Sequence, residues 1–215
     1  SEKMRNQIRG LNQAVNNAED GISLIQTAEG NMNEMHSILQ RMGELATKAA
    51  NDVNETEDRT TIADEMTQLN EELAGIASKA KFNNKPLQSF TGYLQVGANA
   101  GENMAITVKV KIALSTTDVS SHGKASATMS AITVAIKSVS SQRAKLGAVQ
   151  NRLEYTVNNL ENYSENLQSA ESRIRDTDMA TEMVNYSKSN ILQQAAQSML
   201  AQANQSNQGV LSLLQ

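Results

Sequence analysis

Histidine and carboxylate side chains are the first candidates for metal binding or acid–base chemistry in this sequence. The chain has two histidines, His36 in a helical pattern and His122 in a Ser/Gly-rich stretch. Neither has a second histidine or an acidic residue at the spacing of metal ligands, so we expect both to be solvated. Asp176 and Asp178 could form a metal or acid–base pair, but beside Arg175 and before a new helical pattern they are better interpreted as helix caps. The sequence therefore predicts no metal site.

Nucleophilic and phosphate-binding motifs are the next candidates. Serine is plentiful, but no nucleophile elbow and no Ser/His/Asp spacing occurs. Residues 97–101 (GANAG) lie between strand patterns, with no helix start and no lysine after them, and so do not form a phosphate loop. Cysteine is absent, which excludes disulfides, thiolate metal sites and cysteine nucleophiles. We therefore predict no catalytic residues, no cofactor and no enzymatic activity.

Composition favours long helices over a compact globule. Among 215 residues, 39% are hydrophobic but only 3% aromatic, with no Trp and one Pro. Compact cores use more large aromatics, whereas small apolar side chains and rare Pro suit thin helical bundles. The net charge of −4 and the lack of a large basic patch argue against nucleic-acid binding. No apolar run approaches membrane-spanning length.

Three segments carry a narrow apolar stripe, and the one between Leu146 and Ile174 organises the rest. Its spacing of three or four residues is typical of helices that pack side by side at a small crossing angle. Such helices cannot bury their stripes alone, so we predict an elongated antiparallel helical bundle, a coiled-coil-like rod. The main stripe consists of Leu146, Val149, Leu153, Val157, Leu160, Leu167 and Ile174, with Ser164 and Ala170 as small members.

The helices are predicted over about residues 1–50, 58–80 and 128–175. Gly30 is the weakest point of the first helix. The second starts at an N-cap, Thr56 or Asp58, and ends before the turn residues 82–86 (FNNKP). Residues 115–128 are rich in Ser, Thr and Gly and are predicted to form a loop.

Between the second and third predicted helices, apolar residues recur at every second position instead of every third or fourth. Alternation over residues 104–112 and a shorter apolar run at 93–96, separated by the 97–101 turn, predict a β-hairpin region over about 90–112. A lone hairpin is marginal in water, so it must lie against the helices. The inward residues are Met104, Ile106, Val108, Val110 and Ile112.

The last stretch, residues 180–215, has a wide apolar face and a polar face of Gln, Asn and Ser. This polar face argues against an anionic membrane surface, which would favour Lys and Arg. No segment of the chain offers an obvious mate for this face. We therefore predict a C-terminal helix that pairs with an outside partner.

Five long motifs follow one another along the chain. They are NAEDGISLIQTAEG (17–30), the ILQR–ELA segment (38–46), SSQRAKLGAVQNRLEYTVNNL (140–160), ENLQSAESRIRDTDMATEM (165–183) and NILQQAAQSMLAQANQ (190–205). Their sequence resembles bacterial flagellin, the filament subunit, and the resemblance covers nearly the whole chain.

The resemblance implies a rod domain over residues 1–179 and a C-terminal inner-layer helix over residues 180–215. In flagellins the outermost ends form a second coiled layer that lines the filament channel. Large variable outer domains often occur near residues 113–128, where this chain has only a short loop. The resemblance also implies that the N-terminal inner-layer helix lies before Ser1 in a longer protein.

The implied function is mechanical: a structural subunit of the flagellar filament, outside the cell, that supports swimming motility. Flagellins are exported unfolded through the flagellar type III apparatus without a cleaved signal peptide and polymerise under a cap at the distal tip. The implied partners are other flagellin subunits, an export chaperone on the C-terminal segment, and cap and junction proteins. We expect the assembly or chaperone contact at Leu192, Met199, Leu200, Leu211, Leu213 and Leu214.

In this family an innate immune Toll-like receptor reads the rod surface. The matching positions are Gln40, Arg41, Leu45 and Glu65. Gly43 stands where the family usually has Arg, which removes a charge and weakens the helix. Asn84, Pro86 and Gln215 are further departures from the family pattern.

Two alternative functions stay open. An axial protein of the hook–filament junction shares the terminal helices but usually diverges in the five motifs. A generic helical adaptor that binds partner helices does not account for the hairpin.

Overall fold

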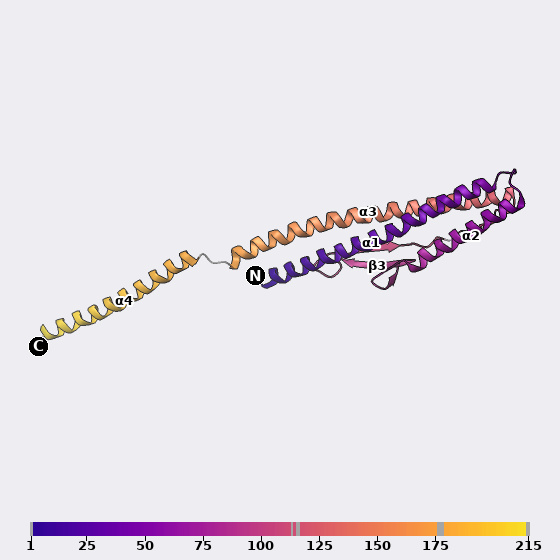
Figure 1. Ribbon diagram of the computed structural model, residues 1–215. Helices are drawn as coiled ribbons and strands as arrows, with labels where there is room; N and C mark the ends of the chain where they lie inside the picture. Colours follow the sequence, from indigo (N-terminus) through magenta and orange to yellow (C-terminus); the bar gives the residue numbers. More distant parts are fainter. Residues whose placement is uncertain (1, 113, 115–116, 176–178, 214–215) are drawn as a thin grey trace. The chain divides into compact units, whose positions relative to one another are not determined.

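The computed structural model describes residues 2–112, 114, 117–175 and 179–213 (Figure 1). The chain divides into two units, Glu2–Leu167 and the residues from Gln168 onward, and each is described by itself. Among the described residues, no helix has the length and hydropathy that a membrane crossing requires.

The first unit is a bundle of long helices with a small β region. It contains α1 (Glu2–Ala49), α2 (Thr56–Lys79) and α3 (His122–Arg175) up to Leu167. Figure 1 shows α1 alongside α3, with α2 and strand β3 next to α1. A contact at each end shows that α1 and α3 are antiparallel. His122 Nδ1 lies 2.6 Å from the Ala50 carbonyl oxygen, and Ser164 Oγ donates to Asn12 Oδ1 at 2.9 Å.

The apolar stripes form the core of this unit, which confirms the predicted mainly α bundle. From α1, the stripe members Ile25, Met35 and Leu39 are completely buried, and α1 continues through Gly30 without a break. From α3, Leu146 and Leu153 pack into the same cluster. Ile174 is the exception in the main stripe, since its side chain is 64% exposed.

The hairpin consists of β3 (Phe90–Gln95) and β4 (Asn103–Val108), paired antiparallel with Phe90 opposite Val108. Alternate residues of β4 face inward as predicted, although the strand ends at Val108 rather than near 112. Val110 is still buried, and its N–H donates to the Leu87 carbonyl at 3.2 Å.

Two glycines of α1 let the hairpin approach closely. A Cβ at Gly10 would lie 2.9 Å from the Ala98 Cβ, and a Cβ at Gly21 would overlap the Leu94 side chain. Asn17 adds a hydrogen bond from its amide to the Gln95 carbonyl at 3.0 Å. The hairpin therefore rests on α1, as its marginal stability alone requires.

A second, minimal hairpin joins β1 (Lys81–Phe82) and β2 (Lys85–Pro86). Its two turn residues, Asn83 and Asn84, have φ values of 45° and 65°. Two successive residues with positive φ make the turn that suits a two-residue hairpin, and Asn adopts this conformation more readily than other non-glycine residues. Asn83 and Asn84 are therefore suited to this turn.

Two predicted helix boundaries were also wrong. The N-cap of α2 is Glu55, not Thr56 or Asp58; the Asp58 carboxylate instead accepts a hydrogen bond from the Glu55 N–H at 3.3 Å. The helix α3 begins at His122, so residues 122–128, predicted as loop, are helical.

Local side-chain contacts explain the early start of α3. Asp118 binds Lys124 Nζ at 2.7 Å, and the Asp118 carbonyl accepts a hydrogen bond from the Thr128 hydroxyl at 2.8 Å. These contacts fix the first turns, and Val119 is buried beneath them. The Ser/Thr/Gly composition of the segment concealed this start.

The second unit contains the last residues of α3 and the helix α4 (Met179–Leu213). Side chains are described for α4 from Ala180 to Gln205. All of them are exposed except Asn190, which is half-buried.

Candidate functional site

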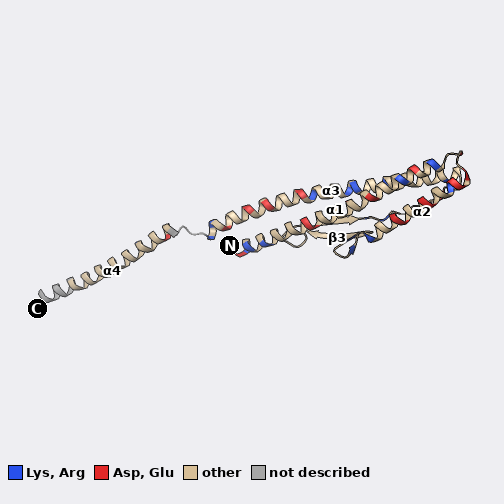
Figure 2. Cartoon of the chain, in the orientation of Figure 1, with Lys and Arg blue, Asp and Glu red and all other residues tan. Residues whose placement is uncertain are grey.

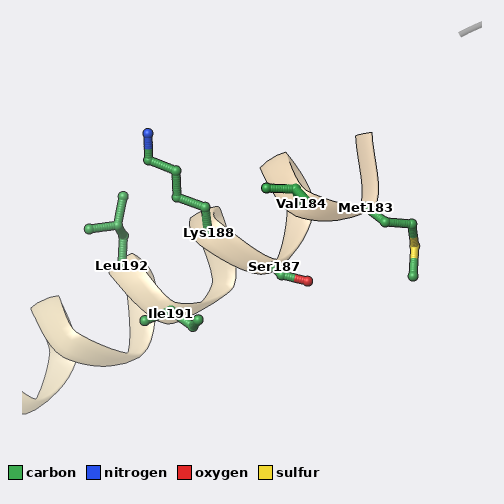
Figure 3. A pocket seen from close by; sticks show the side chains of 6 residues that line it. All are labelled: Met183, Val184, Ser187, Lys188, Ile191 and Leu192. Carbon is green, nitrogen blue, oxygen red and sulfur yellow. The ribbon is translucent and has the colours of Figure 1, made fainter. Parts of the chain in front are cut away.

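Exposed apolar side chains along α4 form the main candidate site. Met183 is 60% exposed, Leu192 59% and Met199 70%. Figure 3 shows part of this surface, with six side chains that project from a single stretch of helix. We call the following residues the α4 apolar surface: Met183, Val184, Tyr186, Ile191, Leu192, Met199 and Leu200.

Charge is almost absent from this helix. Glu182 and Lys188 are the charged residues between Met179 and Gln215, whereas α1, α2 and α3 carry both acidic and basic side chains along their length (Figure 2). A helix with exposed apolar side chains and few charges is poorly solvated, so it favours association with other helices.

The predicted assembly residues fall into two groups. Leu192, Met199 and Leu200 are all exposed on α4. Leu211 and Leu213 lie in α4, but their side chains are outside the described part of the chain, and Leu214 is outside the described residues altogether. Val184 and Ile191, which were not among the predicted contact residues, are exposed in the same way and follow the same helical spacing of apolar residues.

A second candidate site is a surface hollow between α1 and α2. Arg41, Leu45 and Glu65 are among the residues that line it. Arg41 donates from Nε and Nη2 to Glu65 Oε1 at 3.0 and 2.9 Å, and from Nη1 to Glu44 Oε2 at 3.2 Å. These hydrogen bonds, above all those to Glu65, raise the pKa of Arg41 above its ordinary value.

Gln40 is not among the residues that line this hollow, and the four predicted positions differ in accessibility. Gln40, Arg41 and Glu65 are exposed, whereas the Leu45 residue is only 4% exposed and packs in the core. Gly43 leaves room beside it, because a Cβ at this position would lie 3.8 Å from Ile132 Cγ2, an ordinary contact distance. Arg41 and Glu65 therefore present the main polar feature of this surface.

The histidines are not simply solvated. His122 contacts the Ala50 carbonyl at the end of α1, so it links α1 and α3. His36 is half-buried, and its Nδ1 is buried without a hydrogen-bond partner. Within the described part of the chain no group of three or more His, Cys, Asp or Glu side chains could hold a metal ion. Asp176 and Asp178, the other pair considered, lie outside the described residues.

Long helices with buried stripes, together with one helix whose apolar side chains are exposed, define a structural protein that associates through helices. Comparison with known proteins gives the family. The profile described as "Bacterial flagellin N-terminal helical region" matches residues 1–95, and "Bacterial flagellin C-terminal helical region" matches residues 129–214.

Similar proteins and structures agree with these profiles. The chain is 52% identical to a flagellin of Halalkalibacterium halodurans over all of this chain and 82% of that protein. It is 44% identical to a flagellin of Bacillus subtilis, over all of this chain and 84% of that protein. The crystal structure of Bacillus cereus flagellin matches with a TM-score of 0.63 and 25% identity, over 80% of this chain and 94% of that one.

The chain belongs to the bacterial flagellin family. It is accordingly a structural subunit of the flagellar filament, which assembles with other flagellin subunits and serves motility, and it is not an enzyme. No observation favours the junction protein or the adaptor.

Proposed function

We propose that the chain polymerises by burying the α4 apolar surface against helices of neighbouring subunits. The observation that carries this proposal is the exposure of Ile191, Leu192 and Met199 on a helix with almost no charge. Burying a large apolar side chain stabilises an assembly by roughly 1.5–3 kcal/mol, so several of them supply a strong driving force.

The distribution of these residues around the helix indicates more than one partner. At about 100° per residue, Ile191, Leu192 and Met199 share one side of α4, whereas Tyr186 and Leu200 lie on other sides. A helix that is apolar on several sides is buried on several sides. A polymer, in which each helix meets several neighbours, satisfies this requirement better than a closed dimer.

The same surface needs protection before assembly. An export chaperone that covers Leu192, Met199 and Leu200 would keep the subunit from associating inside the cell. Export through the flagellar type III apparatus without a cleaved signal peptide then delivers the chain outside the cell, where cap and junction proteins border the growing filament. In this proposal residues 180–215 are the inner-layer helix and residues 1–179 the rod.

The test is elongation of short filament seeds by the full-length protein, followed by electron microscopy. The double substitution Leu192→Gln with Met199→Gln should slow elongation at least about tenfold, because two apolar side chains no longer gain from burial. The matched control is Gln197→Ala, which removes no apolar side chain from α4 and adds no polar group, so it should elongate like the unsubstituted protein. Normal elongation by the double variant would refute the proposal.

We also propose that the hollow around Arg41 and the neighbouring Gln40 form the surface that a Toll-like receptor reads, with Gln40, Arg41 and Glu65 as the accessible groups and the buried Leu45 beneath Arg41 and Glu65 as packing support. The paired Arg41 and Glu65 side chains offer both charges at one place. Arg41→Ala should weaken binding of the isolated subunit to the receptor ectodomain. Unchanged affinity in a surface plasmon resonance measurement would count against this site.

A further inference from the structure

The methionines of the described structure include a buried class and an exposed class, with Met4, Met104 and Met129 half-buried between them. In the first unit, Met35, Met42 and Met66 are fully buried and Met32 is 2% exposed. On α4, Met183 and Met199 are 60% and 70% exposed. Figure 3 shows the Met183 side chain extending away from the helix, with its sulfur near the end.

This difference has a chemical consequence. A methionine thioether reacts with peroxides according to its accessibility, and the product sulfoxide is polar where the thioether was apolar. The two exposed methionines among the described side chains, Met183 and Met199, both lie on the α4 apolar surface. An oxidant therefore reaches the association surface of the free subunit while the core methionines of the first unit stay shielded.

We propose that Met183 and Met199 are oxidation sites that block assembly of the free subunit when they carry a sulfoxide. The oxidant is a peroxide such as hydrogen peroxide. Its O–O bond breaks, one oxygen bonds to the methionine sulfur, and the other leaves as water. The sulfur loses two electrons and the peroxide gains them.

The proposal rests on the assembly role of the α4 apolar surface. A sulfoxide at Met199 places a strong hydrogen-bond acceptor on a surface that must become dry, and an unpaired polar group buried in this way opposes association. Once α4 is packed in the filament its sulfurs are covered, so the sensitive state is the unassembled one.

The first experiment measures where oxidation occurs. Free full-length subunit is treated with a limited dose of hydrogen peroxide, and the gain of one oxygen is followed by peptide mass spectrometry. Met183 and Met199 should oxidise at least about tenfold faster than Met35 and Met42, because buried sulfurs react only after opening of the core. Equal rates for the two classes would overturn the proposal.

The second experiment measures the consequence for seed elongation, expressed as the rate after treatment divided by the rate before it. This ratio should fall about tenfold for the unsubstituted protein and return after treatment with the two methionine sulfoxide reductases, which reduce both sulfoxide epimers. In the variant Met183→Leu with Met199→Leu the ratio should stay near one. In the control Met104→Leu with Met129→Leu, at half-buried positions of the first unit, it should fall as in the unsubstituted protein.

The outcomes separate this proposal from the assembly proposal. An equal fall in the Met183→Leu, Met199→Leu variant, or no fall in the unsubstituted protein, would overturn the role of these two sulfurs. If elongation proceeds normally in the untreated Leu192→Gln, Met199→Gln variant, the assembly proposal fails instead. The order of oxidation in the free subunit is measured without any assembly step.

Discussion

The helices α1 and α4 are both long and both repeat apolar residues at helical spacing, but their surroundings are opposite. In α1 the repeated residues, such as Met35 and Leu39, are fully buried, whereas in α4 their equivalents Leu192 and Met199 are more than half exposed. The apolar pattern thus indicates which side chains a helix can bury. Whether those side chains are buried depends on a packing partner in the same unit.

The first unit and α4 also differ in how many charged side chains they carry. The helices of the first unit have charged side chains on their outer surfaces, where they form pairs such as Arg41 with Glu65. In α4 the positions between apolar residues are mostly Gln, Asn, Ser and Ala. A charged surface keeps α1 soluble beside its partners, while a neutral polar surface costs less to enclose among neighbouring helices.

The largest expected effect tests whether stability resides in the first unit. Leu39→Ala removes a completely buried side chain and should lower the free energy of unfolding by about 2–5 kcal/mol. The matched substitution on α4, Leu192→Ala, should change the stability of the free subunit by less than about 0.5 kcal/mol, because that side chain is 59% exposed. Urea unfolding of both variants measures the difference. Comparable losses would show that α4 is packed in the free subunit, and the comparison between α1 and α4 would fail.

The parts of the fold that could be predicted from the sequence are those with long regular periods. The stripes of α1 and α3 and the alternation in β4 contain many repeated apolar positions, so single irregularities such as Gly30 do not hide them. The start of α3 could not be predicted in the same way. It depends on contacts of Asp118 with Lys124 and Thr128, and such contacts within a Ser/Thr-rich segment leave no periodic signal.

The two candidate sites also differ in how far the sequence alone could predict them. The apolar residues of α4 could be identified as an association surface from the sequence, because no other segment of the chain offered them a packing partner. The approach of Arg41 to Glu65 depends on how α1 and α2 pack, and spacing alone does not give it; these residues were named through the family resemblance. The contact of His122 with the Ala50 carbonyl was missed, because it joins the ends of two helices distant in sequence.

An intermediate effect is expected at the glycines of α1. Gly30→Ala places a methyl group where nothing lies within 4 Å, so improved helix propensity should stabilise the first unit by about 1 kcal/mol. Gly10→Ala gains the same propensity but meets Ala98 Cβ at 2.9 Å and its Cα at 3.3 Å. Because backbone at Ala98 must move, Gly10→Ala should be less stable than Gly30→Ala by about 1–3 kcal/mol. Thermal unfolding gives the order, and the opposite order would show that the hairpin does not rest on Gly10.

The smallest expected effect concerns the start of α3 and depends on pH. The hydrogen bond from Lys124, followed by those from Ser120, lowers the pKa of Asp118 from 3.8 to about 2. Because the folded state favours the ionised carboxylate, its stabilising contribution is complete above about pH 4 and is lost as the pH falls toward 2. The side chain is exposed, so solvent and salt reduce the effect.

Asp118→Asn should therefore lower stability modestly at about pH 7, and the difference from the unsubstituted protein should shrink between about pH 4 and 2. Lys124→Ala should have a similar effect, and the two substitutions together should cost less than their sum, since each removes the same ion pair. Urea unfolding across this pH range measures all three differences. Since Asp118→Asn keeps the backbone contact with Thr128, a constant difference at every pH would mean that ionisation of Asp118 does not contribute to the stability of α3.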